Sequence, residues 1–510
     1  SGDIEAALQS SEQGLQQTQN TDKVWNYKFR ILKAEALVSQ GRATDSLNLL
    51  ETNPPPQLTG GESLVRRQII QARALCRLNK YPEAELHLAD AERLANAGSP
   101  DSLGDVALVR GSCWLSQNDT VRAQASFVQA LTFSRQNKQP FLEANAEGSL
   151  GLVAMRGERF DEAIDRFKEA LASARFLHAR RAEEKTLGFI GQSFFELGDF
   201  PNASSNTMLA EALASNLGNT DDQRAWLMSL GDQHLAQKNY DAAASDYSHA
   251  LALLTGLNNK EDTATGNCLH DLAQSELGRH NLPKAEEYNQ RVKNMGGSQP
   301  ESPLYIPYLL TSAEIASTKG DYGKSEELLK QIILSKKADD SSRWWAQSDL
   351  ADLYVKWGKT EEADHAFRDA IHTVETARSE ISQEEKRLSF LDAGPIYDGY
   401  VRFLIDHGNE NQAMQVAEFS RARTLAEGMD IDVPKSRLDL HQIQRSLLPN
   451  EVVLAYWLSD KESYLWAVTP SKFRLFRLPP QHEIGQAVES YNAQLQERRR
   501  LEDSPGGSSL

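Results

Sequence analysis

A small residue recurs about every 40 positions along most of the chain, and this recurrence constrains the fold more than any other feature. It occurs nine times in succession, at Ala34, Ala72, Gly111, Gly151, Gly191, Gly231, Ala273, Ala313 and Ala351. A chain of 510 residues is longer than one hydrophobic core normally supports. A fixed period solves this problem, because each copy then needs to pack only against its neighbours. The recurrence therefore predicts a repetitive architecture.

Each period also has an internal pattern. A second small residue follows each of the last eight after a polar or glycine-bearing turn, and a large apolar residue often comes four positions later, as in Ala163, Phe167 and Ala170. Spacings of four and seven residues place side chains on one helical stripe. The small residues allow two antiparallel helices to approach closely. Each period therefore predicts a helical hairpin.

The hairpins must stack into a solenoid, because a single hairpin cannot bury its apolar face. The pattern resembles the tetratricopeptide repeat family in a version with long helices, since its period is 38 to 42 residues. We expect an all-α superhelical solenoid of about nine to ten hairpins, followed by a small C-terminal α/β fragment. The predicted divisions are a cap over 1–24, the solenoid over 25–373, an elongated helix and terminal hairpin over 374–430, and the fragment over 431–510.

The pattern changes after Ala370. A charged stretch over 372–391 predicts an elongated helix, 396–427 a hairpin, and 429–437 a linker. Aromatic and aliphatic residues then dominate 451–458, 463–469 and 473–478, with polar turns between them, which predicts three short antiparallel strands. A helix is expected over about 483–501.

This C-terminal part resembles the CHAT family, in which a caspase-like cysteine peptidase fold is attached to a tetratricopeptide array. Residues 413–428 are similar to the helix that ends such arrays, at Ala413, Ala417, Glu418, Ser420, Arg421, Ala422, Arg423 and Leu425. The segments 387–390 and 397–401 look like its lead-in, and 447–458 with 464–468 resemble the first strands of the CHAT domain. The resemblance covers about 385–500 and implies an array that regulates an attached peptidase domain.

No catalytic residue is predicted within the chain. The His and Cys of CHAT peptidases lie in the later part of their domain; His441 and His482 stand in a different context, and no cysteine follows Cys268. The resemblance implies that the catalytic part lies beyond this chain, so enzymatic activity is left open. Glu418 and Arg421 are spaced to form a surface ion pair. Alternatively, these two residues and Arg423 form a coupling helix that relays movement of the solenoid.

Composition argues against several other functions. The chain has 55 basic and 72 acidic residues, a net charge of −17, which disfavours unspecific binding to nucleic acids or membrane surfaces. Cys268 and His270 are two apart on one predicted helix and point to different faces. There is no HExxH motif and no glycine-rich phosphate loop. We therefore expect neither a metal nor another cofactor.

The cysteines and the termini constrain the cellular location only weakly. Cys76, Cys113 and Cys268 are widely separated, and we expect them to be small core residues in a reducing compartment, not a disulfide framework. No stretch approaches the roughly 20 apolar residues of a membrane span. No signal peptide is evident, but the chain begins Ser1-Gly2 without a methionine. A cytoplasmic location is favoured on these grounds.

The predicted binding surface is the concave face, which the first helix of each repeat lines. Counting from the small residues places these positions on it: Arg66, Arg73, Arg77, Asn145, Arg156, Lys185, Gln192, Asp232, Asn267, His270, Gln274 and Trp345. The three arginines could clamp a carboxylate or phosphate, and the amides could pair with a peptide backbone. The alternative for each residue is that it lies on an ordinary solvent-exposed face of its helix. For Trp345 the alternative is packing in the core. The predicted partner is a protein or peptide, bound either by a regulatory sensor or by a non-enzymatic adaptor.

Overall fold

The structure, a computed structural model, describes residues 4–58, 60–258, 262–380, 394–428 and 440–496. Contacts within the chain divide it into two units, residues 1–291 and 292–510, and each is described by itself. The domain boundaries expected from the sequence stay predictions.

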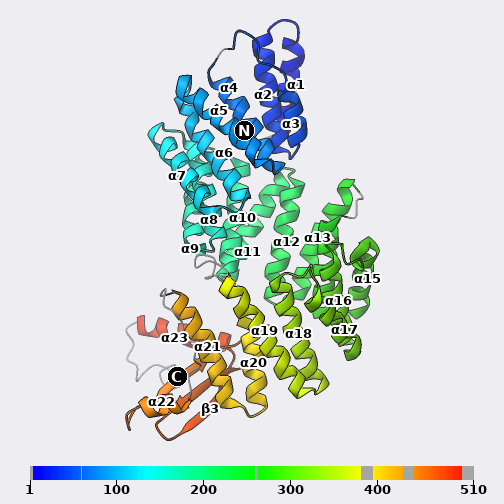
Figure 1. Ribbon diagram of the computed structural model, residues 1–510, viewed down its shortest axis with the longest axis vertical. Coiled ribbons are helices and arrows are strands. Elements are labelled where there is room, and N and C mark those ends of the chain that lie inside the picture. Colours follow the sequence, from blue (N-terminus) through cyan, green and yellow to red (C-terminus); the bar gives the residue numbers. More distant parts are fainter. Residues whose placement is uncertain (1–3, 59, 259–261, 381–393, 429–439, 497–510) are drawn as a thin grey trace. The chain divides into compact units, whose positions relative to one another are not determined.

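Unit 1 consists of a first helix and a series of antiparallel helical hairpins (Figure 1). After α1 (Ile4–Thr18), the pairs are α2 (Lys23–Ser39) with α3 (Ala43–Leu50), α4 (Glu62–Arg77) with α5 (Tyr81–Gly98), α6 (Leu103–Ser116) with α7 (Thr120–Gln136), α8 (Pro140–Arg156) with α9 (Phe160–Phe176), α10 (Arg180–Glu196) with α11 (Phe200–Asn216), α12 (Thr220–Ala236) with α13 (Tyr240–Asn258), and α14 (Thr263–Gly278) with α15 (Leu282–Val292). The predicted solenoid of paired helices is confirmed.

The small residues have the predicted role. All nine are buried. A Cβ atom added to Gly111 or to Gly151 would lie 2.6 Å from the ring of Phe127 or Phe167, respectively, on the second helix of the same hairpin. Gly231 is likewise covered by the ring of Tyr247. The missing side chain on one helix thus makes room for the aromatic ring of the other.

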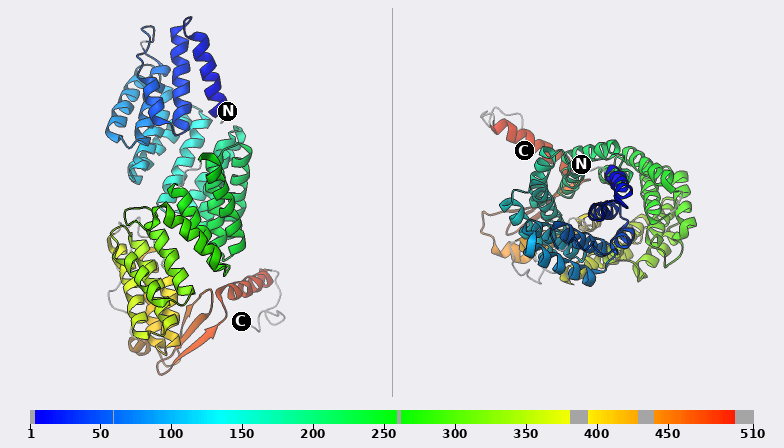
Figure 2. Two further views of the ribbon diagram at one scale, coloured as in Figure 1. Left: turned by 90° about the vertical axis from the view of Figure 1, so that its right-hand side faces the viewer. Right: turned by 90° about the horizontal axis from the view of Figure 1, so that it is seen from above.

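The hairpins stack into two layers. Successive first helices contact one another, as α2 with α4, α4 with α6, α6 with α8, and α10 with α12. Second helices such as α7, α9, α11 and α13 pack against their own first helix and the next one. The helix pairs of unit 1 follow a curved path (Figure 2). We therefore assign the first helices to the inner layer.

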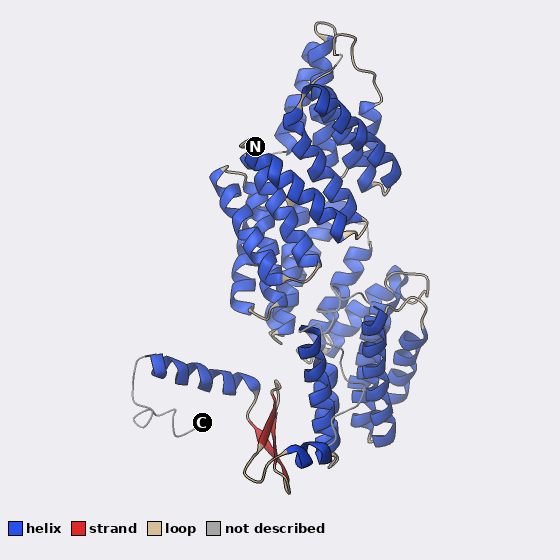
Figure 3. Ribbon diagram, turned by 60° about the vertical axis from the view of Figure 1, so that its left-hand side comes forward, coloured by secondary structure: helices blue, strands red, loops and turns tan. Residues whose placement is uncertain are grey.

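Unit 2 continues the paired helices and ends in a small sheet (Figure 3). Its pairs are α16 (Tyr305–Thr318) with α17 (Tyr322–Leu334), α18 (Asp340–Trp357) with α19 (Thr360–Glu380), and α20 (Gly394–Asp406) with α21 (Glu410–Gly428). These are followed by α22 (Leu440–Ser446), β1 (Val453–Trp457), β2 (Ser463–Val468), β3 (Phe473–Leu478) and α23 (Gln481–Gln496). The sequence did not predict α22. Residues 381–393, 429–439 and 497–510 lie outside the described residues, and with them the end of the predicted elongated helix, the predicted linker and the end of the predicted last helix.

The three predicted strands form an antiparallel sheet in the order β1-β2-β3. One face, with Ala455, Tyr464 and Trp466, is buried in the same core as residues of α20 and α21. Two hydrogen bonds fix this packing: Trp457 Nε1 donates to Asp398 Oδ1 at 2.9 Å, and Arg477 Nη2 to Asp406 Oδ1 at 2.9 Å. The sheet is therefore anchored to the terminal helical hairpin.

The cysteines differ from expectation. Cys76 and Cys113 form a disulfide, with their Cα atoms 5.5 Å apart. The prediction that the cysteines make no disulfide is wrong for this pair, because contact between α4 and α6 brings together positions that are 37 residues apart in sequence. Cys268 is the small core residue that was expected. It is fully buried, and burial raises the pKa of its thiol to about 12.

A buried carboxyl joins α10 to α12. Glu184 is fully buried, and Trp226 Nε1 donates a hydrogen bond to its Oε1 at 2.5 Å. The other oxygen, Oε2, has no hydrogen-bond partner among the described residues. Burial raises the pKa of Glu184 to about 7, although the Trp226 hydrogen bond opposes the shift.

This pKa predicts a pH dependence of stability. Because the folded-state pKa lies above that of the unfolded chain, the stabilising contribution is fully present below about pH 4.5 and is lost as pH rises through 7. Between pH 5 and 8, we expect the free energy of unfolding of the wild type to fall by up to about 3 kcal/mol relative to Glu184→Gln. Urea denaturation across this range measures the difference, with the exposed Asp221→Asn on α12 as the control. Identical pH profiles for wild type and Glu184→Gln would contradict the prediction.

Candidate functional site

A cluster of charged residues occupies the inner layer at the N-terminal end of unit 1. Arg66 Nη2 on α4 lies 2.5 Å from Glu35 Oε2 on α2, and Arg73 Nη1 lies 4.0 Å from Glu35 Oε1. Asp105 on α6 interacts electrostatically with Arg73. Desolvation by the surrounding protein lowers the pKa of Arg73 and raises that of Asp105. Two of the three predicted clamp arginines thus already share one carboxylate.

Arg77 differs from its two neighbours. It is the last residue of α4, its side chain is exposed, and it forms no ion pair with a described residue. Because a guanidinium at this position keeps all its donors available, Arg77 is the arginine of this cluster most ready to bind an incoming carboxylate.

Two other predicted site residues connect neighbouring first helices. Arg156 Nη1 on α8 donates to the carbonyl oxygen of Leu115 on α6 at 2.6 Å. Lys185 Nζ on α10 lies 3.6 Å from Asp222 Oδ2 on α12. Both side chains therefore have a structural partner, which lowers their availability to a ligand.

The C-terminal end of unit 1 presents two carboxyl groups. Asp232 on α12 accepts a 2.6 Å hydrogen bond from the Tyr247 hydroxyl, and Asp271 lies on α14. Burial raises the pKa of both, that of Asp271 to about 7, and the charge of Asp232 adds to the shift of Asp271. Neither makes an ion pair with a described residue. A cation placed here would relieve the repulsion between them.

The predicted amide and imidazole positions lie along the same helices. Asn145 on α8 and Gln192 on α10 are half-buried, as are His270 and Gln274 on α14, whereas Asn267 is exposed. Their role in binding stays a prediction. Trp345, in unit 2, is partly buried and packs against the hydrophobic core of that unit. This position agrees with the core-packing alternative for this residue.

The coupling helix contacts the sheet. Arg421 Nη1 lies 2.7 Å from Glu418 Oε1, and the same guanidinium donates to the backbone oxygen of Tyr456 on β1. The predicted ion pair is therefore present, and it is linked to the strand. The side chain of Arg423 lies outside the described residues.

Sequence reasoning missed two acidic members of the inner layer. Asp105 stands six residues before Gly111, which is the offset that gives Arg66 and Asn145 in their repeats, so the same count could have found it. Asp271 falls on none of the counted offsets. Its proximity to Asp232 depends on how α14 packs beside α12 and α13, which no spacing within one repeat encodes.

Two searches of the described residues returned nothing. No group of three or more His, Cys, Asp or Glu side chains within the described part of the chain is arranged to hold a metal ion. No helix among the described residues is long and apolar enough to cross a membrane.

Comparison with known proteins identifies the repeat. Residues 222–295, from α12 to α15, match the tetratricopeptide repeat family. This part of the chain therefore carries tetratricopeptide repeats. The family match ends before the segment that resembles the CHAT family, so it gives that resemblance no support. No curated protein sequence matches the chain.

The chain is similar to solved structures of other proteins. The apo form of the quorum sensor NprR from B. thuringiensis has 14% sequence identity and a TM-score of 0.53, and the match covers 72% of this chain and 99% of NprR. A signal-transduction ATPase with a tetratricopeptide sensor, PH0952 from Pyrococcus horikoshii, has 13% identity and a TM-score of 0.47, over 71% of this chain and 55% of that protein. At such identity, the likeness to NprR concerns the fold alone.

Proposed function

We propose that the inner layer of unit 1 binds an extended peptide segment of a partner protein. The observation that carries this proposal is the pair Asp232 and Asp271, two carboxyl groups with raised pKa and no ion-pair partner among the described residues. A lysine or arginine side chain of the peptide would compensate them. An acidic side chain or a terminal carboxylate would bind Arg77, with Arg66 and Arg73 beside it.

The solenoid suits such a ligand. Stacked first helices form one continuous surface, along which an extended chain can contact several repeats at once. The half-buried amides of Asn145 on α8 and Gln192 on α10 stand between the two charged ends and can pair with peptide backbone groups, and that of Gln274 lies on α14 with Asp271. Charge at the ends then sets the direction of the peptide, because the reversed orientation would place like charges together.

A pull-down tests the proposal. The full chain is immobilised, incubated with a lysate of the cells that produce it, and the captured partner is quantified by mass spectrometry. We expect the variant Asp232→Lys/Asp271→Lys, and separately Arg77→Glu, to reduce recovery of that partner at least about tenfold. Arg66→Glu/Arg73→Glu/Arg77→Glu is expected to abolish capture.

A matched control separates the inner layer from general charge effects. Arg93 on α5, a second helix, has a side chain that is 70% exposed, and among the described residues its one ion-pair partner is Asp90 in the preceding turn. Arg93→Glu makes the same change of charge as Arg77→Glu and should leave recovery unchanged, and circular dichroism checks the fold of each variant. Unchanged recovery with both the acidic-end and the arginine variants would show that the partner binds elsewhere.

The regulatory role implied by the CHAT resemblance is a narrower proposal. What supports it is the contact of α21 with β1 through Arg421 and the tryptophan hydrogen bond to Asp398, because a shift of the terminal hairpin would move the sheet with it. The simpler adaptor function needs only the binding surface. A coding sequence that continues past Leu510 with further strands, a His and then a Cys would favour the peptidase regulator.

A further inference from the structure

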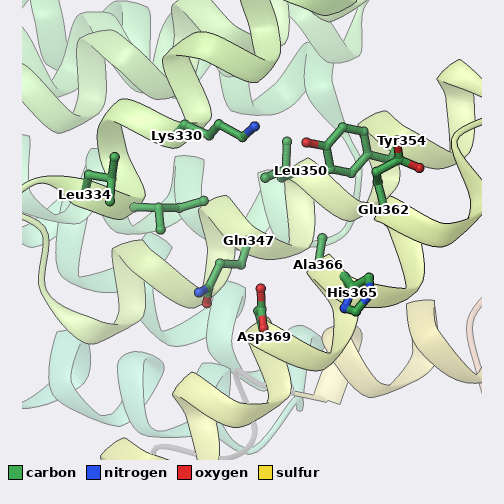
Figure 4. A pocket seen from close by; sticks show the side chains of 10 residues that line it. Lys330, Leu334, Gln347, Leu350, Tyr354, Glu362, His365, Ala366 and Asp369 are labelled. Atoms are coloured by element: carbon green, nitrogen blue, oxygen red, sulfur yellow. The ribbon is translucent and has the colours of Figure 1, made fainter.

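Unit 2 contains a cavity between two second helices and a first helix. It has a volume of about 400 Å³ and lies between α17, α18 and α19 (Figure 4). Side chains of α17 and α19 stand on opposite sides, and those of α18 lie between them. Cavities of this size fall within the range of ligand-binding sites, about 300–1,000 Å³. The unit 1 surface described above has no part in it.

The walls of the cavity are largely apolar. Ile333 and Leu334 of α17, Leu350 of α18 and Ala366 of α19 contribute apolar side chains to them. Leu334 is the last residue of α17, and its side chain is 82% exposed. Covering such an exposed leucine at the rim of an apolar cavity with another apolar side chain is favourable, because it removes apolar surface from water.

One buried acceptor in the cavity wall is unsatisfied. Gln347 Oε1 is inaccessible to solvent and has no hydrogen-bond partner among the described residues. A buried carbonyl oxygen without a donor costs about 1–3 kcal/mol. Because Gln347 lines the cavity, rotation of its side chain toward the cavity would present this oxygen to an N–H group of a ligand, which would supply the missing donor.

The charges at the rim are not balanced. Lys330 is already engaged, since its Nζ lies 2.6 Å from Glu326 Oε1, which also accepts a hydrogen bond from the Tyr354 hydroxyl at 2.8 Å. On α19, Glu362 and Asp369 line the cavity two turns apart, are exposed, and form no ion pair with a described residue. The ionisable side chains at the rim without an ion pair among the described residues are therefore these two carboxylates and the imidazole of His365.

We propose that this cavity binds a basic peptide segment of a partner protein through one aliphatic side chain. The aliphatic side chain would enter between Leu334, Leu350 and Ala366, and a peptide N–H would donate to Gln347 Oε1. A lysine or arginine one or two positions away would pair with Glu362 or Asp369. This site is independent of the inner-layer proposal, because it is formed by helices of unit 2 and the inner-layer site by helices of unit 1.

A random twelve-residue phage-display library, selected on the immobilised full chain, tests the site. The enriched peptides are synthesised with a fluorophore, and their affinity is measured by fluorescence anisotropy. We expect them to share an aliphatic residue close to a lysine or arginine. Leu334→Asp and Asp369→Lys should each weaken binding at least about tenfold. Both side chains are exposed, so neither change should affect folding.

Two controls make the result specific. Glu361→Lys changes the same charge on the same helix but at a residue that does not line the cavity, and it should leave affinity unchanged. Arg77→Glu in unit 1 should also have no effect on these peptides. No enrichment, an acidic consensus, or affinities unaffected by Leu334→Asp and Asp369→Lys would each overturn the proposal. Loss of binding with Arg77→Glu alone would assign the peptides to the inner layer instead.

Discussion

Removal of the Cys76–Cys113 disulfide is expected to lower the free energy of unfolding by about 4 kcal/mol, because the bond closes a loop between residues 37 apart in sequence. In the chain-entropy account, such a crosslink acts by restricting the unfolded chain. The bond also ties α4 to α6, which belong to consecutive repeats. Since each repeat contacts mainly its neighbours, the loss should be largest in the N-terminal repeats of unit 1.

Guanidinium denaturation with and without dithiothreitol measures the effect, and hydrogen exchange shows where protection is lost. Cys76→Ala/Cys113→Ala should reproduce the reduced wild type and should not respond to dithiothreitol. Cys268→Ala, which removes the buried free thiol, serves as a control and should respond to the reductant as the wild type does. Equal midpoints for oxidised and reduced wild type would contradict the prediction.

A side chain at Gly151 is expected to destabilise unit 1 by about 3 kcal/mol, because it would overlap the Phe167 ring. A Cβ atom at this position would lie 2.6 Å from that ring, and both residues are buried within one hairpin. Gly151→Val would therefore force α8 and α9 apart or push the ring from its position. Thermal or urea denaturation of the variant measures the loss.

The same helix provides the matched control. A Cβ atom at Gly148, three residues earlier on α8, would be 3.8 Å from the Cβ atom of Ala170, which is ordinary contact. Gly148→Val should change stability by less than about 1 kcal/mol, since relief of the glycine entropy cost offsets any crowding. In a Phe167→Ala background, Gly151→Val should cost much less than in the wild type. Equal losses at both glycines would show that the recurrent small residues do not set the distance between the helices.

Much of the fold could be predicted from local pattern. The recurrence of Gly111, Gly151 and Gly231 predicted the hairpins, because the residues that allow the two helices of a hairpin to approach each other lie within one repeat. The three strands were recognisable because aromatic and aliphatic runs alternate with polar turns over 451–478. The helix α22 was missed, since its seven residues carry too short a pattern to distinguish them from a linker.

The candidate site could be predicted only in outline. Offsets from the small residues located Arg66, Arg73 and Asp232 on the inner layer, but not the partners of these side chains. Arg66 and Arg73 share Glu35 across two repeats, and Arg156 reaches the backbone at Leu115. Contacts of this kind depend on the angle and offset between neighbouring hairpins.

The sequence by itself determined that this protein is a stack of helical hairpins and where each hairpin turns. These properties follow from periodicity within about 40 residues, where helix geometry fixes which side chains share a face. Only the tertiary structure decided that Cys76 bonds to Cys113, that Asp232 and Asp271 lie together, and that α17, α18 and α19 enclose a cavity. The physical reason is that each of these features joins separate helices, and the packing between helices sets their relative position.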